Sequence, residues 1–264
     1  MSSNSPRILT FPPSRQFTFD IGKLGAQKHY VRGLVEVDIT EALHKIKESR
    51  GSGNKVTLAS WLAKVTALTV LDHPPLNGVR LSGNRIMVYD DVDVSLTIEK
   101  EINGTAVPLP VVVRSANLKS AAEINTEIQA ARDQLVKEQG NYVLGQSSEP
   151  FWLRAAAAVP QWIRLIFWKQ YILGRRMKSI MGTVMITAVG MVSSLDGWII
   201  PSGIHPLLIA VGSLNKKPEL IDGQWQKRDK LHLTIAVDHD IIDGIPAMRF
   251  CDDLVRRMEK AEGL

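Results

Sequence analysis

The sequence predicts a single α/β domain built around a large mixed β-sheet flanked by helices. Three observations support this prediction. Stretches with the apolar–polar alternation of strands are interleaved along the chain with stretches of helical spacing. The chain has 264 residues, 45% of them hydrophobic, which is enough to bury a sizeable core. No internal repeat or low-complexity linker divides it.

The first predicted elements are a strand and two helices. Residues 29–39 alternate apolar and polar side chains, as a half-buried strand does. Thr40 stands where the N-cap of a helix is expected, and residues 51–54 form a flexible Gly-Ser-Gly-Asn break. Thr57 is expected to cap the second helix, which ends at His73 because two prolines follow and proline cannot continue a helix.

The later elements follow the same two patterns. Residues 84–98 are strand-rich, and the apolar run 107–113 contains two prolines, which predicts an edge or irregular strand. Residues 118–136 have helical spacing. The last third predicts three strands and a final amphipathic helix, at 182–189, 207–212, 231–237 and about 245–260.

One segment, at about 151–176, does not fit this alternation. It is rich in tryptophan (Trp152, Trp162 and Trp168) and aliphatic residues, with basic residues between them. It is too interrupted for a transmembrane helix, which needs about 20 mostly apolar residues. Three interpretations remain open: a buried helical hairpin, the lining of a channel for a hydrophobic acyl group, and a segment that lies on a membrane with its arginines toward the headgroups.

Composition narrows the class of protein. The single cysteine, Cys251, cannot form an internal disulfide or a cysteine-based zinc site, which indicates a reducing compartment. The formal net charge of +5 and pI of about 9.3 fit an anionic ligand, but Lys and Arg are scattered and no nucleic-acid-binding motif is present. The N-terminus has neither a signal-peptide nor a transit-peptide pattern, so a cytoplasmic location is expected.

The motif that bears chemistry lies near the C-terminus, where a strand ending in Val237 runs into Asp-His-Asp-Ile-Ile-Asp-Gly. This pattern places the imidazole of His239 at a strand end, followed by Asp243 and Gly244 in a tight turn into a helix. Histidine titrates near neutrality and can act as a general base, although a hydrogen-bonded turn histidine is the plainer alternative. The aspartates do not have calcium-loop spacing, and no metal site is expected.

This motif and much of the chain resemble a known family. VDHDIIDG followed by IPAMRFCDDLVRRMEK is similar to the His-x-x-x-Asp-Gly signature of the catalytic domain of 2-oxoacid dehydrogenase dihydrolipoyl acyltransferases, which belongs to the chloramphenicol acetyltransferase superfamily. Further segments resemble that domain in order, among them HYVRGLVEVDITEAL, GTAVPLPVVVRSANLKSAAEINTEI and LLIAVGSLNKKPELIDG. The resemblance extends over almost the whole chain after about residue 27, so residues 1–28 are expected to form an N-terminal arm and residues 29–264 a single catalytic domain.

The resemblance implies the CoA-dependent acyltransferase fold and a homotrimer with a substrate channel at each subunit boundary. His239 would deprotonate the thiol of coenzyme A, or of a lipoyl or phosphopantetheine arm, and the thiolate would attack a thioester directly. Asp243 would mainly hold the turn by pairing with an arginine of the N-terminal segment, for which Arg15 is the candidate. No covalently bound cofactor is implied.

Two residues depart from the family pattern. Alanine, Ala188, stands where the family has a serine that donates a hydrogen bond to the oxyanion. Thr187 is adjacent but should face the other way on a strand, and Ser193 or Ser194 could substitute if the loop folds back. Asp240 replaces the arginine that commonly follows the histidine, and a carboxylate there would tend to raise the pKa of the imidazole.

A third departure concerns the partners. No stretch of the sequence resembles a lipoyl domain or a subunit-binding domain, so we expect the acyl group to come from CoA or from a carrier arm on another protein. The sequence therefore predicts an acyltransferase that moves an acyl group between a thioester and a thiol or small acceptor. The alternative is a catalytically degraded trimeric scaffold or regulatory subunit of an acyltransferase or 2-oxoacid dehydrogenase-type complex. Peripheral membrane contact through the tryptophan-rich segment is compatible with both.

Overall fold

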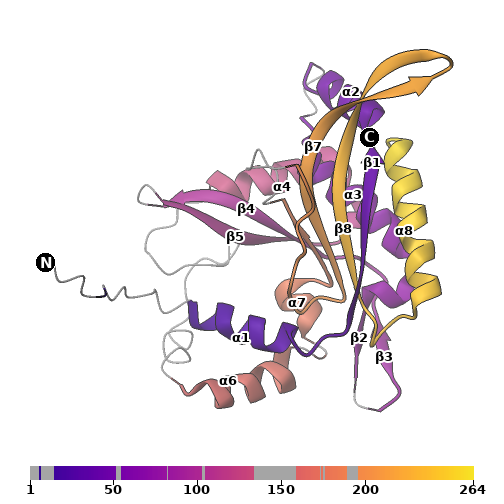
Figure 1. Cartoon of the computed structure of the whole chain (residues 1–264). Helices are drawn as coiled ribbons and strands as arrows, with labels where there is room; N and C mark the ends of the chain where they lie inside the picture. Colours follow the sequence, from indigo (N-terminus) through magenta and orange to yellow (C-terminus); the bar gives the residue numbers. More distant parts are fainter. Residues whose placement is uncertain are drawn as a thin grey trace, which may run out of the picture.

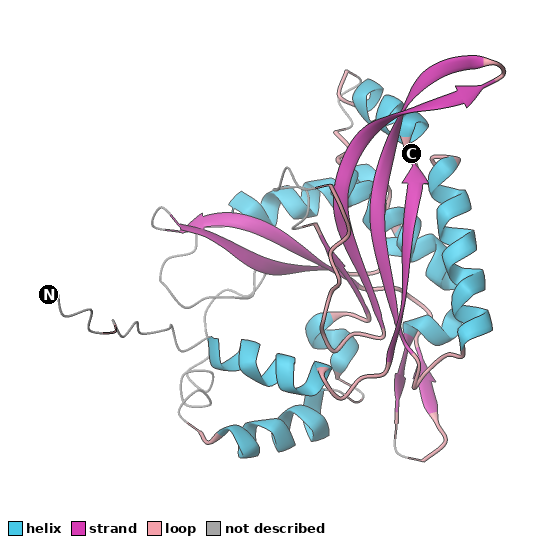
Figure 2. Ribbon diagram, in the orientation of Figure 1, coloured by secondary structure: helices cyan, strands magenta, loops and turns pink. Residues whose placement is uncertain are grey.

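The computed structural model describes residues 6, 15–51, 55–81, 83–102, 105–133, 159–172, 174, 176–188 and 196–264. Its strands are β1 (Tyr30–Asp38), β2 (Gly78–Arg80), β3 (Ile86–Val88), β4 (Val94–Ile102), β5 (Thr105–Val113), β6 (Val184–Thr187), β7 (Leu207–Ile221) and β8 (Gln224–Asp238). Six of them form one sheet in the order β1-β8-β7-β6-β4-β5 (Figures 1 and 2). Because β6 runs parallel to both β4 and β7 while the other pairs are antiparallel, the sheet is mixed, as predicted.

The helices lie on both faces of this sheet. The longer ones are α1 (Arg15–Gly25), α2 (Thr40–Ser49), α3 (Leu58–Asp72), α4 (Ala121–Asp133) and α8 (Gly244–Glu259). Shorter helical segments are η1 (Pro74–Asn77), η2 (Ala116–Leu118), α6 (Gln161–Phe167), the π-helical turn η3 (Trp168–Ile172) and α7 (Met177–Met181).

The main core lies between the sheet and α2, α3, α4 and α8. Strand alternation turns Leu231, Leu233, Ile235 and Val237 of β8 toward these helices, where all four are buried. Trp61 of α3 is fully buried there, and its indole N–H donates to the carbonyl of Glu262 at 2.9 Å. This core fixes the strand end that carries the candidate histidine.

The opposite face carries a smaller apolar cluster. Leu24, Val79, Met177 and Ile204 form it, and they come from α1, β2, α7 and the segment that precedes β7. Tyr30 fastens that segment to β1, because its hydroxyl donates to the carbonyls of Gly203 and His205 at 3.1 and 2.7 Å. Figure 1 shows α1 and α6 side by side at this end of the molecule.

The helix starts show one prediction confirmed and one wrong. Thr57 caps α3 in a capping box with Ser60, as predicted. Thr40 is not an N-cap: it is the first residue of α2, and Ile39 occupies the N-cap position without a side-chain hydrogen bond. The Thr40 hydroxyl instead donates to the carboxylate of Asp38 at 2.7 Å, so this side chain ties the helix to the preceding strand.

The β7–β8 hairpin extends well beyond the predicted strands at 207–212 and 231–237. It projects past the rest of the sheet (Figure 1) and closes at Asp222 and Gly223, whose φ angles are +50° and +79°. Asp-Gly is the dipeptide that two-residue hairpin turns favour, because both central residues need positive φ. β5 lies at one edge of the sheet, as the prolines in its sequence predicted.

The N-terminal arm contains a helix that the sequence did not predict, and the tryptophan-rich segment contains helices, as its interpretation as a helical hairpin required. α1 occupies residues 15–25, and α6, η3 and α7 lie within residues 161–181. Trp162 is 65% exposed, Trp168 packs against the smaller apolar cluster, and Trp152 lies outside the described residues. The interpretation as a buried hairpin is therefore wrong for α6. Among the described helices none is both long and apolar enough to span a bilayer.

Candidate active site

His239 lies directly after the last residue of β8. Its backbone N–H donates to the carbonyl of His29 at 2.9 Å, which joins this position to the residue preceding β1. The amides of Ile241 and Ile242 both donate to the carbonyl of Asp238, at 3.0 and 3.4 Å, so the chain turns at once toward α8. The residue is exposed on the surface of the chain. This is the strand–turn–helix placement that the motif predicts.

Buried charge fixes the strand end before the histidine. The carboxylate of Asp238 is fully buried and lies 2.5 Å from the Nζ of Lys28, and its other oxygen accepts from the amide of Asp240 at 3.2 Å. Burial, and then the charge of Asp238, raise the pKa of the Tyr30 hydroxyl. Leaving a buried carboxylate without its cation would destabilise the fold, so the ion pair between Lys28 and Asp238 fixes the end of β8.

Asp240, the residue that departs from the family pattern, faces an imidazole and a guanidinium. Its carboxylate oxygens lie 3.0 Å from Nδ1 of His29 and 3.6 Å from the guanidinium of Arg80. The hydrogen bond from His29 is the main reason that the pKa of this carboxyl lies below its usual range. Its negative charge is therefore compensated by groups from β2 and from the residues before β1.

Asp243 and Gly244 begin α8. Asp243 occupies the N-cap position with extended backbone, is exposed, and makes no capping hydrogen bond with its side chain. Arg15, its predicted partner, begins α1, and since its side chain is outside the described part of the chain, this pairing stays a prediction. A Cβ on Gly244 would meet nothing within 4 Å, and its φ is not left-handed, so nothing in the described chain requires glycine there.

The oxyanion candidates lie at the end of β6. Val184 and Ile186 point into the main core and Ala188 packs against it, so Thr187 faces the other way, as strand alternation predicts. Ser193 and Ser194 lie outside the described residues. Neither serine can be placed relative to His239.

The strand register separates Thr187 from His239. Thr187 pairs with Ala210 of β7, which pairs with Thr234 of β8. His239 follows Thr234 by five residues, and at about 3.3 Å per residue this is a separation of about 17 Å along the strand. One thioester carbonyl cannot contact both residues of the same chain, so a site that used both would take them from two subunits.

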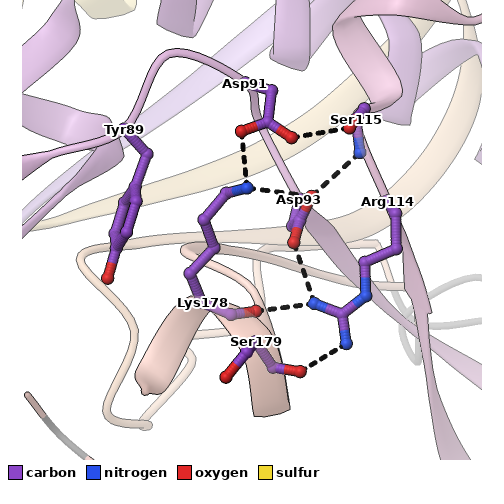
Figure 3. A pocket seen from close by; sticks show the side chains of 7 residues that line it. All are labelled: Tyr89, Asp91, Asp93, Arg114, Ser115, Lys178 and Ser179. Atoms are coloured by element: carbon purple, nitrogen blue, oxygen red, sulfur yellow. Dashed lines mark hydrogen bonds and ion pairs between the residues drawn. The ribbon is translucent and has the colours of Figure 1, made fainter. Parts of the chain in front are cut away.

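A polar cavity of about 570 Å³ lies elsewhere on the sheet, near the start of β4 (Figure 3). Arg114 donates to Asp93 at 2.8 Å and to two carbonyls of α7, those of Lys178 and Ser179, both at 2.6 Å. Lys178 lies 2.6 Å from Asp91, and its ammonium is the main cause of a lowered pKa at that carboxyl. These pairs join the segments next to β4 and β5 to α7. Arg114 and Lys178, the basic residues that line the cavity, are each paired with an aspartate of the same cavity.

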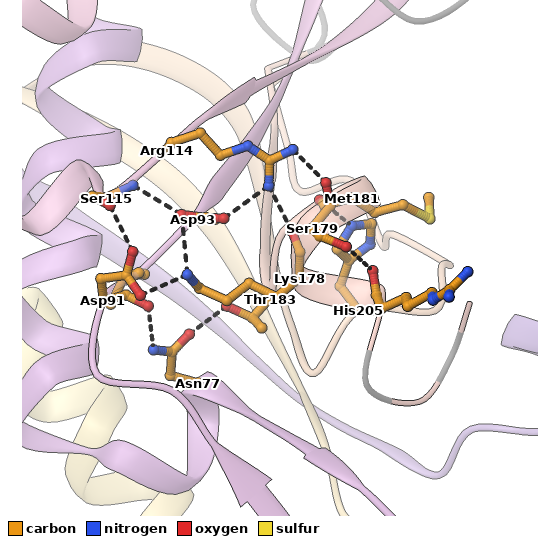
Figure 4. A network of polar contacts seen from close by, with 12 residues as sticks. Asn77, Asp91, Asp93, Arg114, Ser115, Lys178, Ser179, Met181, Thr183 and His205 are labelled. Carbon is orange, nitrogen blue, oxygen red and sulfur yellow. Dashed lines mark hydrogen bonds and ion pairs between the residues drawn. The ribbon is translucent and has the colours of Figure 1, made fainter. Parts of the chain in front are cut away.

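Figure 4 extends this network to His205, which is fully buried. One ring nitrogen, Nε2, lies 3.1 Å from the carbonyl of Met181, and Nδ1 has no partner in the described part of the chain. Burial lowers the pKa of this histidine to about 4. His205 is therefore neutral at neutral pH and acts as a structural donor.

Another network, which sequence reasoning missed, fastens residues 196–198 to the sheet. His232 is buried between Ser213 and Glu36, with Nδ1 2.9 Å from Oγ of Ser213 and Nε2 2.8 Å from a carboxylate oxygen of Glu36. Its ring stacks on Trp198 at 3.9 Å, and Gly197 and Ser213 exchange hydrogen bonds. Because Ser213 is only 6% exposed, this hydroxyl–imidazole–carboxylate chain positions the segment and does not offer a nucleophile to substrate.

Comparison with known families bears directly on this site. The sequence model of the 2-oxoacid dehydrogenases acyltransferase (catalytic domain) family matches residues 27–140 and 178–264, which include His239, Asp243 and Gly244. The chain belongs to this acyltransferase family. The unmatched stretch between the two parts contains the apolar segment at about 151–176.

Two curated relatives of this chain are components of dehydrogenase complexes. The acetyltransferase component of the pyruvate dehydrogenase complex of Mycoplasma capricolum is 24% identical over 225 residues, which cover 83% of this chain and 42% of that protein. The mitochondrial succinyltransferase component of the 2-oxoglutarate dehydrogenase complex of Saccharomyces cerevisiae is 23% identical, over 79% of this chain and 36% of that protein. The chain thus spans less than half the length of these relatives.

Solved structures confirm the predicted fold. A probable dihydrolipoamide acetyltransferase from Listeria monocytogenes superposes with a TM-score of 0.69 at 19% identity, covering 98% of this chain and 97% of the other. Dihydrolipoamide acetyltransferase from Azotobacter vinelandii gives 0.67 at 17% identity, covering 97% and 93%. Chloramphenicol acetyltransferase gives 0.50 at 14% identity, covering 96% and 95%. The acyltransferase-family chain therefore has the CoA-dependent acyltransferase fold.

Proposed function

We propose that this protein is an acyltransferase that moves an acyl group from a thioester to a thiol, with His239 as general base. The observation that carries the proposal is the position of His239, exposed at the fixed end of β8 in a chain that belongs to the acyltransferase family. The motif residues Asp243 and Gly244 directly precede and begin α8, where they define the path of the chain after the imidazole.

The proposed chemistry needs one base and no covalent enzyme intermediate. The imidazole of His239 takes the proton of the acceptor thiol, and the thiolate attacks the thioester carbonyl to form a tetrahedral oxyanion. The intermediate expels the donor thiolate, which takes the proton back from the imidazolium. Losing a side-chain donor to the oxyanion typically costs a factor of about 10²–10³ in rate, so with Ala188 in the family's serine position, Thr187, Ser193 or Ser194 of a neighbouring subunit is proposed as the donor.

We propose a homotrimer in which each site lies between two subunits. The separation of about 17 Å between Thr187 and His239 along one chain supports shared sites, because a donor and a base on opposite ends of the strands can meet only across an interface. One structural relative forms the cubic core of a pyruvate dehydrogenase multienzyme complex, which is an oligomer of this fold. A trimer in light scattering is the expected result.

The proposed substrates are thioesters of CoA, or of a lipoyl or phosphopantetheine arm. The curated relatives are dihydrolipoyllysine-residue acyltransferase components, which favours a lipoyl arm as one of the two thiols. We propose that residues 1–28 form an N-terminal arm and residues 29–264 the catalytic domain, in the cytoplasm.

The experiment that tests this proposal separates an enzyme from a scaffold. Wild-type protein is assayed with acyl-CoAs of increasing chain length, with dihydrolipoamide or pantetheine as acceptor, against reactions without protein. Thiol-dependent release of CoA for at least one chain length is the expected result. Absence of transfer with every donor and acceptor, from a protein that is folded and trimeric, would favour the scaffold, for which the missing serine at position 188 is the specific observation.

A further inference from the structure

Helix α6 is amphipathic, but its apolar face points outward and its charged face points inward. Trp162 and Ile166 are four residues apart, as are Ile163 and Phe167, so these side chains form two adjacent rows on one face. They are 65%, 55%, 40% and 44% exposed. A soluble helix normally turns such a face toward the core.

The inward face of α6 carries a charge instead. Arg164 is 6% exposed, and its guanidinium forks onto the fully buried carboxylate of Asp20 on α1, with Nε and Nη2 at 2.7 and 2.9 Å from the two oxygens. A further donor of Arg164 bonds the carbonyl of Val159 at 2.6 Å. Reversing α6 would expose this pair and bury the apolar rows, so the ion pair fixes the orientation that leaves the apolar face outward.

Exposed apolar area of this kind marks a contact surface. The charged residues around it indicate the kind of partner. Phe19 of the adjacent helix α1 is also half exposed. Between Glu149 and Asp196 the sequence contains six basic residues and no acidic one. Among the described residues of α1, α6 and η3 the only acidic one is Asp20, which pairs with Arg164, so the charges that these elements expose are basic: Lys23 and Lys169.

This combination favours a lipid surface over a two-fold contact between copies of this face. Two copies docked face to face would place basic residues against basic residues, which is unfavourable. An anionic bilayer satisfies both features, because apolar side chains enter the acyl boundary while Lys and Arg meet the headgroups, each contributing about 1 kcal/mol near the surface. Tryptophan is well suited to this boundary.

We propose that the outer face of α1, α6 and η3 is a membrane-docking surface that binds anionic lipid bilayers with α6 lying in the plane of the interface. The surface is defined by Trp162, Ile163, Ile166 and Phe167 together with Lys23 and Lys169. None of these residues belongs to the His239 motif, and the surface does not depend on the acyl-transfer proposal.

The test is cosedimentation of the full chain with vesicles of phosphatidylcholine alone or mixed with phosphatidylglycerol. The patch variant carries Trp162→Ser and Ile166→Ser. The matched control carries Trp225→Ser and Leu220→Ser, which remove an equally exposed tryptophan and aliphatic pair from the β7–β8 hairpin. Circular dichroism melts establish that both variants fold.

Wild type and control are expected to sediment with anionic vesicles and not with phosphatidylcholine alone, and the patch variant to lose most of this binding. Lys23→Glu with Lys169→Glu, which leaves the apolar rows intact, should weaken binding at least about tenfold and reduce its dependence on salt. No sedimentation of wild type, or equal sedimentation of wild type and patch variant, overturns the proposal. A patch variant that changes only the oligomeric state in light scattering shows that the face is a protein contact, and also overturns it.

Discussion

Replacing His205 with glutamine should make the protein less sensitive to mild acid. The ring is fully buried, and burial holds its pKa at about 4 against an ordinary value of 6.5. Between these two values the unfolded chain binds a proton that the folded chain excludes, so stability from this residue is complete above pH 6.5 and falls as the pH drops toward 4. Each pH unit in that window is worth about 1.4 kcal/mol, which gives a loss of about 2 kcal/mol between pH 7 and pH 5.

The assay is urea unfolding of wild type and His205→Gln at pH 7 and pH 5. Glutamine does not titrate, and its amide can still donate to the carbonyl of Met181, which Nε2 of His205 approaches at 3.1 Å. Wild type should lose about 2 kcal/mol more than the variant on acidification. His44→Gln, at an exposed site on α2, is the control and should lose as much as wild type. Equal losses in wild type and His205→Gln would refute the reasoning.

Three further predictions concern the stability of the fold. Lys28→Met leaves the buried Asp238 carboxylate without its cation and should lower the free energy of unfolding in urea by about 3–5 kcal/mol. Adding Asp238→Asn should restore most of that free energy. A double variant that shows the full loss of stability would contradict this prediction. Gly212→Ala would place a Cβ against the carbonyl of Gly197 and should destabilise by about 1–3 kcal/mol, measured by thermal melts against wild type. Gly244→Ala, with open space around its Cβ, should leave the melting temperature unchanged or raised, and a drop like that of Gly212→Ala would show that the turn does need glycine.

The sequence predicted the sheet well where local signals and burial agree. The alternation in β1 and the apolar strands of the last third identify the sheet, and Thr57 identifies the start of α3. The outer part of the β7–β8 hairpin was missed because most of its side chains are polar and its few apolar residues do not alternate with them, although Asp222-Gly223 is a hairpin turn signal.

Other features depend on contacts that no local pattern contains. α1 contains two glycines and has no acidic residue in its first turn, and it packs through Asp20 against an arginine 144 positions away. The strand end of His239 is predicted by its motif, but its separation from Thr187 follows from the register of β6, β7 and β8, which alternation alone does not determine. The partners of Asp240 are likewise distant in sequence.

The most direct test of the central claim is the rate of thiol–thioester exchange by His239→Ala, with the best donor and acceptor of wild type. The account predicts a fall in kcat of about 10²–10⁴-fold with an unchanged melting temperature, because the thiol loses its general base while the exposed side chain contributes little to the fold. Exchange at the wild-type rate in His239→Ala would contradict the account.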